Sequence, residues 1–141
     1  MGTRRSAREA ALQFLFQDDF VLKELRPSED LQERFSDFCS LYQVNKKARP
    51  YILKLIQGTI DHCEAIDAQI EANAKNWRLS RIAATDRNLI RIAVYEMLYC
   101  DDVPDQVAMN EALEIAKRFG SHDSPAFING VLDGIKKNQE K

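Results

Sequence analysis

Several features of other protein classes are missing from this 141-residue sequence. No apolar run approaches the ~18 residues that a membrane-spanning helix needs, which excludes a spanning protein. Residues 1–20 contain no long apolar segment and no small-residue cleavage site, so we expect no secretory signal. Lys and Arg number 20 against 22 Asp and Glu, so any nucleic-acid binding has to use a local basic patch.

Cysteine is scarce, and the motifs of catalysis are missing. Three cysteines without a Cys-x-x-Cys spacing argue against a disulfide framework or a zinc site, and they fit a reduced, cytoplasmic protein that binds no metal. The sequence contains no glycine-rich phosphate loop, no His-Glu-x-x-His and no nucleophile elbow. The acids lie beside basic residues at helical spacing, as Glu114 and Lys117 do, which is typical of solvated helix faces. We therefore expect neither an enzyme nor a cofactor.

Helical periodicity, in contrast, runs through nearly the whole chain. With only 5 Gly and 4 Pro, the apolar residues recur at i, i+3, i+4 and i+7. They predict an all-α fold of six or seven helices in two packed bundles, within one domain covering residues 1–141. The two helical halves are expected at about 1–77 and 78–141, divided at the connector near Trp77. The predicted segments are 3–18, 30–42, 45–74, 85–100, 104–119 and 124–137.

Three glycines lie inside these predicted helices. Gly58 weakens its helix relative to alanine, so a kink or a close contact is expected there. Gly130 and Gly134 are four residues apart, and we expect one of them to allow a close helix contact. At the end of its helix, Phe119 is assigned to the inner face, together with Ala116.

The first predicted helix has a basic flank. At about 100° per residue, Arg4, Arg5 and Arg8 share one side of the helix with Leu12 and Phe16, next to the core stripe. Guanidinium groups suit phosphate oxygens, and exposed aromatic rings stack on unpaired bases. The flank therefore suggests RNA or DNA binding. The alternatives are a solvated helix end, and core positions for the two apolar side chains.

An ordered set of motifs in the second half of the chain makes the sequence recognisable. The segment RIAATDRNLIRIAVYEM at 81–97 is followed by Val103-Pro104, Asn110-Glu111-Ala112, AKRFG at 116–120 and FINGVL at 127–132. Together with the basic opening at 4–13, these motifs resemble the NusB family of bacterial transcription antitermination factors. The resemblance covers the whole chain and is strong over residues 81–134.

This resemblance implies a function and a set of residues. Members bind boxA RNA of ribosomal RNA leader transcripts together with a small-subunit ribosomal protein, NusE, and join RNA polymerase in an antitermination complex. The family's RNA contacts fall on Arg4, Arg5, Arg8, Gln13, Phe16, Asp123 and Phe127. Its partner contacts fall on Asp86, with Arg87, Arg91 and Tyr95 on neighbouring turns. Some relatives carry further basic residues at the positions of Ser6 and Ala126, so the basic patch is smaller here.

Two alternative functions remain open at this stage. The same domain type occurs in ribosomal RNA cytosine methyltransferases. The other alternative function is that of a purely structural homodimer, formed through the apolar flank of the first helix. Local structure also offers simpler roles, since Asp86 and Asp123 suit helix starts and Phe127 suits the core.

Overall fold

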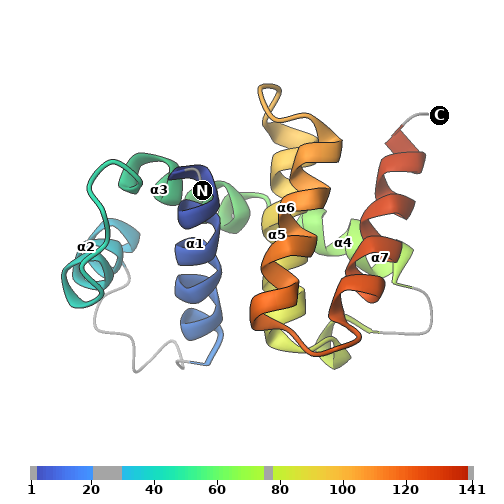
Figure 1. Ribbon diagram of the computed structural model, residues 1–141, viewed down its shortest axis with the longest axis horizontal. Helices are drawn as coiled ribbons and strands as arrows, with labels where there is room; N and C mark the ends of the chain where they lie inside the picture. The colour runs from blue at the N-terminus through green and yellow to red at the C-terminus, as the bar shows by residue number, and fades with distance from the viewer. Residues whose placement is uncertain (1–2, 21–29, 75–77, 140–141) are drawn as a thin grey trace.

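Seven α-helices and one short 3-10 turn account for nearly all of the regular structure in the computed structural model, which describes residues 3–20, 30–74 and 78–139 (Figure 1). No strand occurs in these ranges, so the prediction of an all-α fold is confirmed. Within the same ranges no helix is long and apolar enough to cross a membrane. The helices are α1 (Thr3–Phe20), α2 (Leu31–Leu41), α3 (Arg49–Asp61), α4 (Cys63–Asn73), α5 (Ala84–Tyr99), α6 (Asp105–Phe119) and α7 (Ser124–Gln139), with the 3-10 turn η2 at Leu79–Arg81.

Helix α1 occupies a central place because it packs on both α3 and α5. Figure 1 shows α1, α2 and α3 on one side of the molecule and α4 to α7 on the other, with α1 facing α5 and α6. The predicted core stripe of α1 is buried, including Ala7, Ala11 and Phe14. Leu12 is buried as well, so the core position that the sequence analysis gives as an alternative for it is confirmed.

The prediction of one long helix over 45–74 is wrong, because the chain divides into α3 and α4 at His62. The backbone of His62 leaves helical geometry at φ −109° and ψ 15°. Helix α3 packs on α1 and α5, whereas α4 packs on α5 and α7. The packing partners therefore change at His62. The predicted boundary between the helical halves, near Trp77, lies outside the described residues and stays a prediction.

Two of the glycines provide close helix contacts. A Cβ atom on Gly58 would lie 2.0 Å from Cζ of Tyr95, so only glycine lets α3 approach that ring. A Cβ atom on Gly134 would lie 2.6 Å from Oδ1 of Asn73, where α7 meets α4. Gly130 faces open space. The expected close contact in α7 is thus confirmed, at Gly134.

Candidate nucleic-acid interface

The innermost arginine of the basic flank is buried against α5. Arg8 makes a bidentate ion pair with Glu96, with Nε–Oε1 and Nη2–Oε2 distances of 2.8 and 2.9 Å. The hydroxyl of Tyr51 donates a hydrogen bond to the same carboxylate. The exposed fractions of the two ionic side chains are only 5% and 1%. The expectation that Arg8 lies exposed on the flank is therefore wrong, because helix spacing places it over a carboxylate that the sequence pattern did not reveal.

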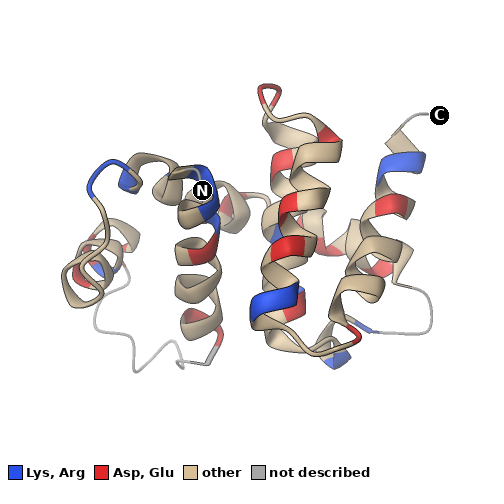
Figure 2. Cartoon of the chain, viewed as in Figure 1, with Lys and Arg blue, Asp and Glu red and all other residues tan. Residues whose placement is uncertain are grey.

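Arg5 and Arg4 meet two further carboxylates nearer to solvent. Arg5 pairs with Glu111 through Nε–Oε1 and Nη2–Oε2 distances of 2.9 and 2.5 Å, and both side chains are partly buried. Arg4 contacts Asp102 at 2.8 Å, with about half of each side chain exposed. Burial thus decreases from Arg8 to Arg5 to Arg4, toward the start of α1. We call these six charged residues the arginine–carboxylate network. Figure 2 shows its basic residues at the start of α1.

The network joins its members to one another. Nη1 of Arg8 also reaches Oε1 of Glu111 at 3.3 Å, so Glu111 contacts two guanidinium groups. The guanidinium of Arg4 lies 4.4 Å from the ring centroid of Tyr51, in cation–π geometry. The hydrogen bond from Arg5 lowers the pKa of Glu111, because the ion pair favours the charged form of this carboxylate. The N-terminal half of the chain is consequently held to α5 and α6 by charge as well as by apolar packing.

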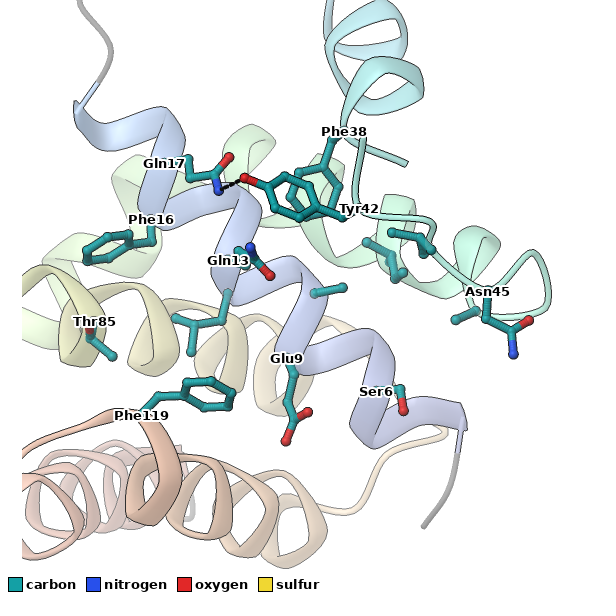
Figure 3. A pocket seen from close by; sticks show the side chains of 15 residues that line it. Ser6, Glu9, Gln13, Phe16, Gln17, Phe38, Tyr42, Asn45, Thr85 and Phe119 are labelled. Carbon is teal, nitrogen blue, oxygen red and sulfur yellow. Dashed lines mark hydrogen bonds between the residues drawn. The ribbon is translucent and has the colours of Figure 1, made fainter. Parts of the chain in front are cut away.

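A groove of about 660 Å³ runs along the exposed face of α1, beginning at Ser6 and Glu9, next to Arg5 in the sequence. Figure 3 shows Phe16, Thr85 and Phe119 on one side of α1 and Phe38 and Tyr42 on the other. The Gln17 side chain donates a hydrogen bond of 2.7 Å to the hydroxyl of Tyr42 across the groove. The remaining lining residues are Ala10, Leu12, Gln13, Val44, Asn45, Ala48 and Ile52. The groove therefore places aromatic rings and amide groups on one open surface.

The sequence analysis gives two residues of this groove as RNA candidates, and it assigns a third residue of the groove wrongly to the core. Gln13 is exposed and Phe16 is partly exposed, and both line the groove. Phe119 was predicted to face inward, but it is 48% exposed and lines the groove from the end of α6. Arg118 stacks over the Phe119 ring at 5.0 Å and pairs with Glu9 at 2.8 Å, at the edge of the groove. The position of Phe119 at the last helical residue, just before Gly120, was the signal that could have revealed its exposure.

The two remaining RNA candidates lie outside this groove, at the start of α7. Asp123 is exposed and directly precedes the helix. Phe127 is partly buried and packs against the hydrophobic core. The structure thus brings Gln13, Phe16 and Phe119 together, while Asp123 and Phe127 occupy a separate position.

The predicted partner residues lie on α5 and are largely engaged within the chain. Arg91 makes a bidentate pair with Asp67, at 2.8 and 3.0 Å, and Arg87 contacts Asp19 at 3.2 Å. Tyr95 is buried beside Gly58. Asp86 is buried, and its Oδ1 has no hydrogen-bond partner among the described residues. This buried carboxylate oxygen lies in the first turn of α5.

The comparison with known families decides the identity. The family model described as the NusB family matches residues 5–137. The chain belongs to the NusB family.

Among the described residues, no group of three or more His, Cys, Asp or Glu could hold a metal ion.

Curated relatives and solved structures agree with this assignment. Transcription antitermination protein NusB of Desulfotalea psychrophila is 60% identical over 136 residues, covering 96% of each chain. NusB of T. maritima superposes with a TM-score of 0.81 at 37% identity, covering 95% of this chain and 90% of that one. A crystal structure of antitermination factors NusB and NusE in complex with double-stranded RNA gives a TM-score of 0.81 at 26% identity, covering 98% of both chains.

Proposed function

We propose that this chain is a transcription antitermination factor that binds boxA RNA together with the ribosomal protein NusE. In this role it lets RNA polymerase read through terminators, and it acts in the cytoplasm as a binding factor and not as an enzyme. The observation that carries the proposal is the likeness over 98% of both chains to the NusB of a complex with NusE and double-stranded RNA. The relatives named transcription antitermination protein NusB support it.

The RNA site that we propose combines the outer arginines with the groove. Arg4 and Arg5 contact phosphates, because guanidinium forks match phosphate oxygens and these two side chains reach solvent. Phe16 and Phe119 offer ring faces to unpaired bases, and Gln13 offers an amide beside them. This arrangement favours single-stranded RNA, whose bases are free to enter a groove lined by aromatic rings.

Three further residues, which do not line the groove, receive other roles. We propose that Asp123 and Phe127 form a second RNA contact at the start of α7, where the resemblance places one. Arg8 holds α1 on α5 through Glu96 and keeps the outer arginines in position, since its own guanidinium is buried.

For the protein partner we propose the surface at the first turns of α5. Asp86 lies in the first turn of α5, where the resemblance places a partner-binding acid, and its buried Oδ1 has no hydrogen-bond partner among the described residues. Arg87, Arg91 and Tyr95 follow on the next turns of α5, and the two arginines are held by ion pairs with Asp19 and Asp67. Changing Asp86→Lys is expected to weaken binding of NusE more than binding of RNA alone. Equal losses in both assays would contradict this assignment.

A filter-binding titration of boxA-like and scrambled single-stranded RNA, with and without NusE, tests the proposed function. The double variant Arg4→Ala/Arg5→Ala is expected to bind more weakly. Its salt dependence should flatten by roughly 1.4 in slope, at about 0.7 for each lost phosphate contact. Lys136→Ala/Lys137→Ala, at the other end of the chain in the last turn of α7, is the charge-matched control. Equal affinity for both RNAs, or equal losses in both variants, would contradict the proposal.

The groove is tested separately. Phe119→Ala and Phe16→Ala are each expected to weaken boxA binding without changing the salt slope, because they remove stacking and no charge. Stacking is worth about 1–3 kcal/mol per base, which corresponds to roughly 5- to 150-fold in affinity. Unchanged affinity in both variants would show that the bases lie elsewhere.

A further inference from the structure

We propose that Glu111 sets the RNA affinity of this chain, by holding the Arg5 guanidinium in a bidentate pair that an RNA phosphate has to replace. The inference rests on the proposed function and concerns the regulation of the same site. It makes RNA binding an exchange of one anion for another at Arg5.

The geometry of the pair supports the exchange. Glu111 receives hydrogen bonds from Nε and Nη2 of Arg5, which form one edge of the planar fork. A phosphate that binds an arginine in bidentate fashion uses the same kind of edge. Carboxylate and phosphate therefore compete for this edge of Arg5, and the observed affinity is the difference between the two interactions.

Glu111 is also held in place for this competition. Its Oε1 accepts a hydrogen bond from Nη1 of Arg8, and Arg8 is itself fixed by the buried Glu96. Because the hydrogen bond from Arg8 already restricts the Glu111 side chain, Glu111 loses little conformational freedom when it pairs with Arg5. It is consequently a stronger competitor than a freely moving surface acid.

Arg4 provides the contrast within the same network. Its pair with Asp102 uses a single guanidinium nitrogen, Nη2, and about half of each side chain is exposed. Exposed pairs of this kind are screened by salt and contribute little. Arg4 is therefore readily available to a phosphate, whereas the Nε/Nη2 edge of Arg5 becomes available when Glu111 is displaced.

The variant Glu111→Gln tests the proposal, because glutamine keeps the shape and an acceptor oxygen for Arg8 but loses the negative charge. Affinity for boxA-like RNA is expected to rise about five-fold, the scale of a partly exposed ion pair. The salt slope should steepen by up to about 0.7, because the phosphate contact at Arg5 then forms without releasing a carboxylate, which takes up a cation in the wild type. Glu114→Gln is the matched control, since Glu114 lies one turn along α6, carries the same charge and pairs with Lys117.

A double-mutant cycle separates displacement from a general charge effect. In an Arg5→Ala background, Glu111→Gln should change RNA affinity no more than Glu114→Gln does. If Glu111→Gln equals Glu114→Gln in the wild-type background, or still tightens binding without Arg5, the inference is overturned. In both cases the proposed function stands, provided that wild-type protein prefers boxA-like over scrambled RNA. Loss of that preference in the wild type would overturn the function itself.

A second measurement needs no variant that alters folding. In NMR spectra of the wild-type protein, addition of boxA-like RNA should shift the Nε–Hε resonance of Arg5 and the carboxyl carbon of Glu111. The Nε–Hε resonance of Arg8 should stay in place, since its pair with Glu96 is buried. An unchanged Glu111 carboxyl signal at saturating RNA would overturn the inference.

Discussion

The buried pair between Arg8 and Glu96 gives the most direct test of how this fold is held together. Changing Arg8→Ala leaves a carboxylate with 1% exposure facing only the hydroxyl of Tyr51 among its described hydrogen-bond partners. Breaking a buried ion pair on one side costs about 3–5 kcal/mol, because an uncompensated charge stays buried. For a chain of this length we expect the melting temperature to fall by about 10–15 °C.

The assay is urea and thermal unfolding followed by circular dichroism at pH 7, with Arg4→Ala as the control. Arg4 sits one turn earlier on α1, and its ion pair is about half exposed. Its removal should change the free energy of unfolding by no more than about 1 kcal/mol. If Arg8→Ala and Arg4→Ala have equal effects, the reasoning about burial is refuted.

A combined replacement distinguishes the cost of an unpaired charge from the worth of the pair. In Arg8→Met/Glu96→Leu/Tyr51→Phe, all three polar partners disappear together and apolar groups of similar size take their place. Such replacements are often neutral or stabilising, by up to about 4 kcal/mol. The triple variant should therefore be clearly more stable than Arg8→Ala. A triple variant as unstable as the single one would show that the pair itself, and not the stranded carboxylate, sets the effect.

The remaining predictions concern two glycines and one titration. Gly58→Ala should destabilise the fold by about 1–3 kcal/mol, because its Cβ would lie 2.0 Å from the ring of Tyr95. A Cβ atom on Gly130 would face open space, so Gly130→Ala should raise the free energy of unfolding by up to about 1 kcal/mol. Urea midpoints that move in the same direction in both variants would contradict this contrast. Arg5 lowers the pKa of Glu111 in the folded chain. The ionised Glu111 therefore contributes its full amount to the free energy of unfolding above pH 4.5, the ordinary pKa, and this contribution is lost as the pH falls through the lowered pKa. In Glu111→Gln, the free energy of unfolding should therefore depend less on pH below about pH 4.5. An unchanged pH dependence would refute a stabilising Arg5–Glu111 pair.

The helices were largely predictable from the sequence because each buries its own apolar stripe. Five of the six predicted segments correspond to single helices, with ends that differ by at most about two residues from those observed. The break at His62 was not predictable, because neither glycine nor proline marks it and the apolar spacing continues from α3 into α4. The break coincides with a change of packing partner, from α1 for α3 to α7 for α4.

The site was predictable in part, for a related reason. The helical wheel places Arg4, Arg5 and Phe16 on one flank of α1, and that placement needs only the first turns of one helix. It carries no information about what faces that flank. Glu96 and Glu111 are 88 and 106 residues away from their arginine partners. A local pattern cannot show contacts at that separation, so the burial of Arg8 escaped it.

The carboxylates of the arginine–carboxylate network explain how a chain of net charge −2 holds three arginines at one helix end, because each arginine is paired with an acid. Arginines at the start of α1 lie at the positive end of the helix dipole, which disfavours them by a few tenths of a kcal/mol each or more. In the free chain Glu96, Glu111 and Asp102 supply the compensating negative charge. In the proposed RNA site, the RNA backbone replaces the outer two carboxylates but not the buried one, so the expected RNA affinity equals the gain over contacts already made. Such a difference is small by construction, and a protein partner bound at α5 would then raise the total affinity through a second interface on the same complex.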